Sequence, residues 1–209
     1  ETIEGIQIRD FDLFNNKKLI IDMSSDICSY EFDWTNLSYV YAGAQKNLGI
    51  PGVTICIVKK GFVEESDQTS YLNINNHISK NSSFNTPPTF SIYVLLKILD
   101  WVLDAGGINE IQKNNFKRAS RIYDFLDLHN EHFNLVAPID LRSYSNIVFD
   151  FKDSSKTEKF LNDCIARGFI GLNGHRSVGG VRVSNYNSIT DEMVNDFLNT
   201  LNDFISLDK

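Results

Sequence analysis

The chain has 209 residues, of which 42% are hydrophobic and 22% are charged, and its formal net charge is −7. This size and composition suit one large domain, or one and a half smaller ones, with a real hydrophobic core, and they exclude wholesale disorder. The negative net charge argues against electrostatic binding to nucleic acid or to an anionic membrane. To bind an acidic ligand, the protein would need arginines concentrated at one place.

Short apolar runs between polar segments predict the first elements. Residues 19–23 predict a buried strand that carries Asp22 near its end, and open α/β sheets bind ligands at the carboxyl ends of their strands. The β-branched run at residues 53–58 predicts a second buried strand. The polar residues 64–83, rich in Asn and Ser, predict a loop.

Helices dominate the rest of the chain. One helix is predicted to begin at Thr86 and Pro87, because proline is favoured in a first turn, and to end at residues 105–107. The further predicted elements, in chain order, are a helix at 108–128, a strand at 145–151, a helix at 156–167, a strand at 179–184 and a helix with Thr190 as its N-cap. This pattern predicts an α/β protein: residues 1–107 as the tail of a larger domain and residues 108–209 as a compact α+β domain.

Cysteine and histidine patterns favour neither disulfides nor a metal site. The three cysteines lie far apart, include no CxxC pair and indicate a reducing, cytoplasmic setting: Cys28, Cys56 and Cys164. His129 and His132 could bind a metal or simply flank a solvated helix end, and no third ligand is in sight. No apolar run reaches transmembrane length. The chain opens on Glu1 without a signal peptide, and we expect it to start within a domain.

Lys46 is the candidate for covalent chemistry, and Asp22 is the candidate for binding the same cofactor. Lys46 lies in the run Tyr-Ala-Gly-Ala-Gln-Lys-Asn-Leu-Gly, whose small residues would let a planar ligand approach the backbone. A lysine that reacts with a carbonyl must spend time neutral, which burial favours. Asp22 suits pyridoxal phosphate (PLP), because a carboxylate keeps the pyridine nitrogen of this cofactor protonated. Taken singly, Lys46 also fits a surface loop, and Asp22 fits a capping or turn position.

Two other segments could bind anions. His175, Arg176 and Arg182 lie among glycines, and guanidinium groups bind carboxylate or phosphate with two parallel hydrogen bonds. They also fit two surface arginines and a turn histidine. Asn85 and Thr86 offer an amide, a hydroxyl and the N–H groups of a helix start to a phosphate, or they form a plain N-cap.

Four stretches of the chain, in order, resemble the phosphoserine aminotransferases, a family of fold-type I, PLP-dependent transaminases. The stretches are residues 2–6, 22–26, 41–49 with 84–90, and 174–182. The resemblance covers essentially the whole chain and roughly the C-terminal three fifths of the family's length. It implies that residues 1–107 are the C-terminal portion of the large PLP-binding domain, a mixed sheet flanked by helices. Residues 108–209 would be the small α+β C-terminal domain.

The resemblance implies a role for each candidate residue. Lys46 would hold PLP as a Schiff base and move the proton between Cα and C4′, while Asp22 would pair with the pyridine nitrogen. Thr2 would hydrogen-bond the phenolic oxygen of the ring, and Gln45 would contact the cofactor phosphate. Asn85 and Thr86 would contact the cofactor phosphate of the neighbouring subunit. Arg182 would bind the substrate α-carboxylate. His175 and Arg176 would bind the distal phosphate or carboxylate.

The implied reaction is reversible amino transfer. 3-Phosphohydroxypyruvate and L-glutamate give O-phospho-L-serine and 2-oxoglutarate, in serine biosynthesis and, in some organisms, in pyridoxine biosynthesis. The active unit would be a homodimer with shared active sites, without a nucleic-acid or membrane partner. One alternative is a truncated or inactive remnant of the fold that acts as a dimerisation or binding module. Another is a PLP-dependent lyase for a small amino acid, which the Arg176 and Arg182 pair disfavours.

Overall fold

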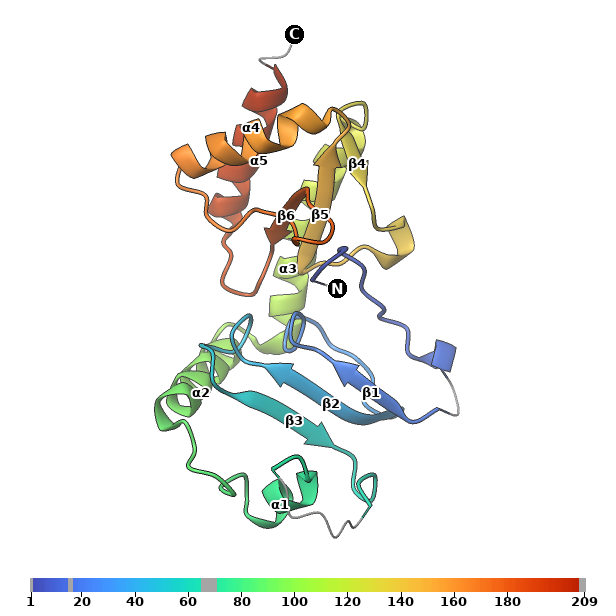
Figure 1. Cartoon of the computed structure of the whole chain (residues 1–209), viewed down its shortest axis with the longest axis vertical. Coiled ribbons are helices and arrows are strands. Elements are labelled where there is room, and N and C mark those ends of the chain that lie inside the picture. Colours follow the sequence, from blue (N-terminus) through green and yellow to red (C-terminus); the bar gives the residue numbers. More distant parts are fainter. Residues whose placement is uncertain (1, 15–16, 65–70, 207–209) are drawn as a thin grey trace. The chain divides into compact units, whose positions relative to one another are not determined.

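The computed structural model describes residues 2–14, 17–64 and 71–206, and these divide into two compact units (Figure 1). The first unit is Asp10–Gly107. The second unit joins the described residues up to Arg9 to those from Ile108 onward. In the described part of the chain, no helix is long and apolar enough to cross a membrane.

The first unit is built on a three-stranded sheet in the order β1-β2-β3. β1 (Leu19–Asp22) runs parallel to β2 (Leu37–Gly43), and β3 (Thr54–Val58) runs antiparallel to β2. β1 and β3 confirm the two strands predicted in this region, but the prediction that they are buried is wrong: none of their residues is buried, because both lie at the edges of the sheet. The central strand β2 escapes prediction because it ends in Ala-Gly, residues that are depleted in strands.

The helix α2 (Thr89–Asp104) confirms the predicted helix but begins later than expected. Thr86 and Pro87 each precede a proline, and a residue in that position is biased away from the helical conformation. Pro88 is therefore the N-cap, and it makes no side-chain hydrogen bond to the helix.

The predicted loop at residues 64–83 contains a short helix, α1 (Ile74–Ser79), so the prediction is wrong over those residues. Asn73 begins α1 because its side-chain oxygen accepts a hydrogen bond of 3.0 Å from the N–H of Asn75. Residues 65–70 of the predicted loop lie outside the described residues.

One face of the first sheet forms the core of its unit. Val40 of β2 is 1% exposed and packs in a cluster that Leu95 and Ile98 of α2 also contact. The alternate residues of β2 point to the other face, where Tyr41 is in register with Asp22 of β1. Asp22 therefore lies on the open face of the sheet, where its carboxylate is exposed.

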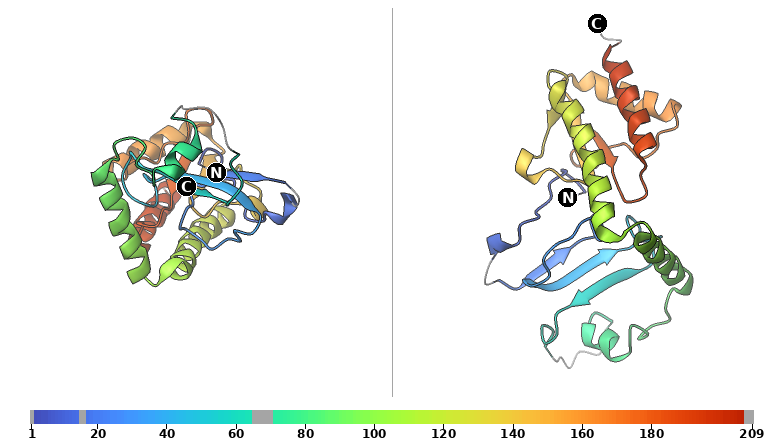
Figure 2. Two further views of the ribbon diagram at one scale, coloured as in Figure 1. Left: turned by 90° about the horizontal axis from the view of Figure 1, so that it is seen from below. Right: turned by 180° about the vertical axis from the view of Figure 1, so that it is seen from behind.

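The second unit packs three helices against an antiparallel sheet in the order β4-β5-β6 (Figure 2). Its elements are α3 (Gly107–Leu128), β4 (Phe133–Leu135), β5 (Asn146–Phe151), α4 (Ser154–Ala166), β6 (Val181–Ser184) and α5 (Asp191–Ser206). All but β4, which has only three residues, confirm elements predicted from the sequence. Thr190 is the expected N-cap of α5, since its hydroxyl accepts a hydrogen bond of 3.2 Å from the N–H of Met193.

Aromatic side chains fill the core of the second unit. Phe149 and Phe160 are fully buried, and the Phe133 ring lies 5.4 Å from the Phe149 ring. Val148, on the opposite face of β5, is covered by the N-terminal segment: a Cβ built on Gly5 would lie 3.3 Å from its side chain. The sheet is thus covered by helices on one face and by this segment on the other.

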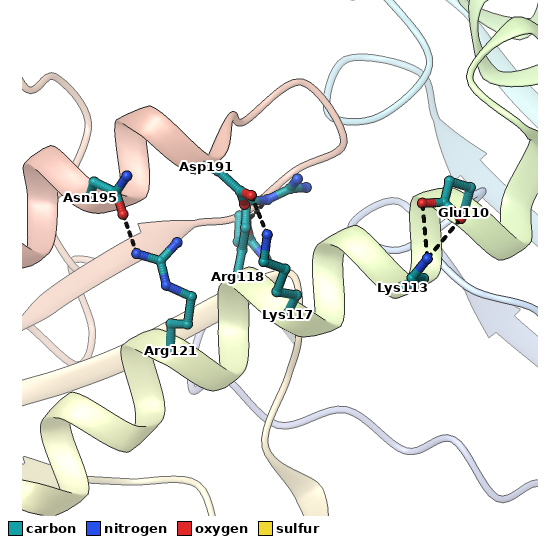
Figure 3. A network of polar contacts seen from close by, with 8 residues as sticks. Glu110, Lys113, Lys117, Arg118, Arg121, Asp191 and Asn195 are labelled. Atoms are coloured by element: carbon teal, nitrogen blue, oxygen red, sulfur yellow. Dashed lines mark hydrogen bonds and ion pairs between the residues drawn. The ribbon is translucent and has the colours of Figure 1, made fainter.

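Polar contacts join α3 to α5 (Figure 3), and a further contact joins α3 to the segment after β6. The Lys117 amine donates a 2.5 Å hydrogen bond to Asp191 and thereby lowers the pKa of that carboxyl group. Both side chains are about half exposed, so the pair contributes little to stability. Arg118 is only 6% exposed, and its Nε donates to the Asn185 side-chain oxygen over 3.0 Å. This buried bond holds the residue that directly follows β6.

Candidate active site

The carboxyl ends of the parallel strands β1 and β2 bring a carboxylate to a fixed place. Asp22 Oδ1 accepts hydrogen bonds from the N–H of Ser24 over 2.9 Å and from its hydroxyl over 2.6 Å. The same hydroxyl oxygen accepts a 3.0 Å bond from the N–H of Gly43, the last residue of β2. Asp22 therefore does form a turn, yet among the described residues no donor reaches its Oδ2. That oxygen can meet a ligand.

Lys46 lies in the turn that follows β2. The buried residues Ala44 and Leu48 anchor this turn in the core, and the Leu48 N–H donates to the Ala44 carbonyl over 2.9 Å. The Lys46 amine donates to the Ser25 hydroxyl over 3.2 Å, and the Asn47 amide donates to the Ser25 carbonyl over 2.9 Å. Lys46 is half-buried rather than a free surface lysine, and it is tied to the serine next to the one that binds Asp22.

The residues predicted to bind the cofactor phosphate have exposed side chains. The Gln45 side chain folds over Gly43, since a Cβ at that glycine would collide with its amide oxygen. Asn85 and Thr86 are exposed in the segment before α2. Because Pro88 is the N-cap, the interpretation of Asn85 and Thr86 as a plain N-cap is wrong, and helix capping does not occupy their polar groups.

In the second unit, β6 places Arg182 beside the N-terminal segment. The Arg182 Nη1 donates to the Thr2 carbonyl over 3.3 Å. Its Nε is buried, and among the described residues it finds no hydrogen-bond partner. A buried donor without an acceptor is costly, so this guanidinium is suited to an anionic ligand that supplies the missing acceptor.

His175 and Arg176 lie in a tight loop that leads into β6. The His175 carbonyl accepts hydrogen bonds from the N–H groups of Val178 and Gly179, over 2.9 and 2.7 Å. The His175 Nδ1 lies 2.6 Å from the Ser177 hydroxyl, which leaves Nε2 for another partner. Arg176 is exposed. The loop therefore offers a ring nitrogen and a guanidinium close to each other in the sequence.

The predicted site residues fall into two sets. Asp22, Gln45, Lys46, Asn85 and Thr86 belong to the first unit, whereas Thr2, His175, Arg176 and Arg182 belong to the second. Ser24 and Ser25, the serines after Asp22, were not among the predicted site residues. Their roles as partners of Asp22 and Lys46 depend on the pairing of β1 with β2, which has no signal in the local pattern.

The histidine pair lies at a solvated helix end. His129 Nδ1 and His132 Nε2 are 3.8 and 3.5 Å from the carboxylate of Glu131, whose side chain is 61% exposed. Within residues 2–14, 17–64 and 71–206, no group of three or more His, Cys, Asp or Glu side chains could hold a metal ion.

The sequence pattern of the family described as aminotransferase class-V matches residues 7–197 of the chain. The chain belongs to the class-V aminotransferase family. A relative named phosphoserine aminotransferase, from Lysinibacillus sphaericus, is 43% identical over 202 residues, covering 94% of this class-V chain and 56% of its own.

Solved structures show the same relationship. The phosphoserine aminotransferase of Bacillus circulans subsp. alkalophilus has a TM-score of 0.95 and 39% identity, covering 100% of this class-V chain and 58% of that one. The PLP-bound enzyme of the same name from Trichomonas vaginalis has a TM-score of 0.87 and 32% identity, with 97% and 58% covered. The class-V chain thus has the α/β fold of PLP-dependent aminotransferases and spans a little over half the length of these relatives.

Proposed function

We propose that this chain supplies the lysine and the carboxylate-binding arginine of a phosphoserine aminotransferase, which moves an amino group between L-glutamate and 3-phosphohydroxypyruvate. The observation that carries the proposal is the attachment of Asp22 and Lys46 to the adjacent residues Ser24 and Ser25, at the carboxyl ends of β1 and β2. PLP, when bound, supplies an aldehyde that receives the amino group and a pyridinium ring that takes up electrons.

The residues of the first unit fit this cofactor. Lys46 holds it through the side-chain amine and moves the proton between Cα and C4′, for which a half-buried amine is suited. Asp22 presents to the ring nitrogen its Oδ2, which no donor reaches within the described part of the chain. The remaining proposed contacts are Thr2 to the phenolic oxygen, Gln45 to the phosphate, and Asn85 with Thr86 to the phosphate of the neighbouring subunit.

The second unit supplies the cationic groups that the substrates require. Glutamate and phosphoserine each carry an α-carboxylate and a second anionic group. Arg182 binds the α-carboxylate, and this role is supported by its Nε, which has no hydrogen-bond partner among the residues that the structure describes. His175 and Arg176 bind the distal phosphate or carboxylate. Gathering these groups into one unit lets a chain of net charge −7 bind dianionic substrates.

The proposal also assigns the two parts of the chain to domains of a longer enzyme. In this assignment residues 1–107 are part of the large PLP-binding domain and residues 108–209 are the small C-terminal domain, although residues 2–9 pack with the second unit. A cytoplasmic location is supported by the three cysteines, Cys28, Cys56 and Cys164, which are all free thiols.

Cofactor binding and substrate binding can be tested on the natural gene product. With added PLP the protein is expected to be yellow, and glutamate is expected to bleach the colour as the amino group is transferred. Arg182→Leu should raise the KM for glutamate and for phosphoserine together, by about 10- to 100-fold, because both lose a charge-assisted hydrogen bond to the α-carboxylate. Stopped-flow absorbance measures both substrates.

Each part of the proposal can fail separately. A protein that stays colourless with PLP would instead be the inactive remnant that acts as a binding module. A yellow protein that glutamate does not bleach would be a PLP enzyme of another kind, such as a lyase. If Arg182→Leu raised the KM of one substrate alone, Arg182 would not bind the carboxylate that both substrates share.

The partner proposed for this chain is a second copy of itself. The stripe Ile92, Leu96, Leu99 and Leu103 follows one side of α2 at spacings of four, three and four residues, and these side chains are 37–73% exposed. Such an apolar stripe is typical of a helix that packs against another helix. Asn85 and Thr86 lie just before α2, which agrees with their proposed contact across a dimer interface.

A matched pair of substitutions tests the dimer. Leu103→Asp places a charge in the stripe and is expected to raise the dissociation constant of the dimer at least about tenfold. Leu13 is as exposed as Leu103, at 72% against 73%, but lies outside α2, so Leu13→Asp is the control. Sedimentation equilibrium on the natural gene product measures both. Equal behaviour of the two variants would contradict an interface on α2.

A further inference from the structure

The residues from Thr2 to Arg9, here called the strap, run along the segment that precedes β5. The Ser143 N–H donates to the Gly5 carbonyl over 2.8 Å, and the Gln7 N–H donates to the Leu141 carbonyl over 2.7 Å. These bonds join residues that are far apart in the sequence but belong to the same unit. The strap is therefore fixed to the second unit by backbone pairing.

Arg9 is the clamp at the end of the strap. Its guanidinium lies over the Tyr144 ring, 4.3 Å from the centroid. Its Nη1 donates to the Arg142 carbonyl over 2.7 Å and to the Gln7 side-chain oxygen over 3.0 Å, and its Nη2 donates to the Asp140 carbonyl over 3.3 Å. All these partners are uncharged groups, so the clamp depends on the planar, forked shape of the guanidinium rather than on ion pairing.

The clamped segment is itself anchored to α3. Arg142 makes two hydrogen bonds with the carboxylate of Asp127, over 2.6 and 2.8 Å. The Tyr123 hydroxyl donates to the Ser143 carbonyl over 2.9 Å and is buried. Arg9 therefore ties the strap to a rigid element rather than to a loose loop.

The strap ends beside the arginine proposed to bind substrate. The Arg182 Nη1 donates a hydrogen bond to the Thr2 carbonyl. Among the described residues, this carbonyl is the only hydrogen-bond acceptor of the Arg182 guanidinium. Gly5 lies against Val148, which is in register with Arg182 across β5 and β6. Displacing the strap would remove this acceptor and uncover the neighbouring strand.

We propose that Arg9 is a positioning residue, which clamps the strap so that the Thr2 carbonyl orients the Arg182 guanidinium towards the α-carboxylate of the substrate. The inference rests on the proposed role of Arg182. Arg9 touches neither substrate nor cofactor and acts through the strap alone. Its loss therefore weakens substrate binding more than the chemical step.

Substitution of Arg9 in the natural gene product tests the inference. Arg9→Ala is expected to raise the KM for glutamate about three- to thirtyfold, which lies within the range of coupling through a shared network or backbone shift, and to change kcat less than about twofold. Arg9→Lys should behave like Arg9→Ala, because it keeps the charge but loses the fork. Arg167→Ala is the control, since it removes exposed ion pairs of the same unit with Asp163 and Asp203 and leaves the strap intact.

Two readouts separate positioning from a general loss of stability. Hydrogen exchange of the strap amides, measured by mass spectrometry without substrate, should accelerate in Arg9→Ala but not in Arg167→Ala. In an Arg182→Leu background, Arg9→Ala should have no further effect on the KM, because the group through which it acts is gone.

The outcomes distinguish this inference from the proposed function. Unchanged exchange of the strap, or an effect of Arg9→Ala on the KM that adds fully to that of Arg182→Leu, would overturn the role of Arg9 while the enzyme remained an aminotransferase. A wild-type protein that turned over no glutamate would overturn the proposed function, and the orienting role towards a substrate carboxylate with it.

Discussion

Replacing Lys46 by alanine is expected to abolish amino transfer while leaving the protein folded. The variant loses both the amine that holds the cofactor and the base that moves the proton, so kcat should fall by more than about 10³-fold. The hydrogen bond from Lys46 to the Ser25 hydroxyl, which the variant loses, contributes about 1 kcal/mol to the stability of the fold. Steady-state kinetics with glutamate and circular dichroism during urea unfolding measure the two effects.

Two further lysine variants make this prediction specific. Lys46→Arg keeps the positive charge next to Ser25 but provides no amine that can react with an aldehyde, so it should be as inactive as Lys46→Ala. Lys60→Ala removes an exposed lysine of the same unit and should have normal activity. In the wild-type protein, borohydride should attach the cofactor to the peptide that contains Lys46. Activity in Lys46→Arg, or attachment at another lysine, would refute the assignment.

Replacing Gly174 by alanine is expected to lower the stability of the second unit strongly. A Cβ at this position would collide with the Gly179 carbonyl oxygen and would lie 2.5 Å from its carbon and 2.9 Å from the Gly180 oxygen. These are backbone atoms of the loop that holds His175 and Arg176, so relief requires the loop to open. We expect the free energy of unfolding to fall by about 2–4 kcal/mol, measured by urea denaturation.

Gly171→Ala is the matched control for this loop. Gly171 has a φ of +82°, but its Cβ would meet nothing within 4 Å. Alanine there is expected to cost about 1 kcal/mol through backbone strain alone. If the two variants were equally stable, the close packing at Gly174 would not constrain the loop. A loss of affinity for phosphoserine in Gly174→Ala, but not in Gly171→Ala, would connect the loop geometry to the proposed anion site.

Local patterns predicted the elements that depend on local sequence. Residues typical of helix starts predicted α2 and α5, and the apolar run that ends in an acid predicted that Asp22 lies at a strand end, where β1 does end. The start of α2 was predicted too early, because the prediction relied on the preference of proline for a first turn. Pro88 instead biases the preceding Pro87 away from the helical conformation. The helix α1 was missed because it is short and composed mostly of polar residues.

The geometry of the candidate site could not be predicted from local sequence. Lys46 is tied to Ser25 across 21 positions, and this contact exists only because β2 returns alongside β1. Local sequence does not indicate the partner of the strap, because Arg9 meets the Arg142 carbonyl across 133 positions. The proposed roles of individual residues therefore came from the resemblance of whole motifs rather than from spacing.

Residues 2–9 leave the ribosome long before the surface that they bind. Thr2 and Arg182 are separated by 180 positions, so their contact closes a long loop. Such a contact cannot form before its second partner is synthesised, and the entropy of closing the loop must be offset when it does form. The lysine turn after β2, in contrast, depends on residues that are synthesised together. During synthesis, the Lys46 amine can therefore react with a carbonyl compound before the chain contains the arginine proposed to bind the carboxylate of an amino acid.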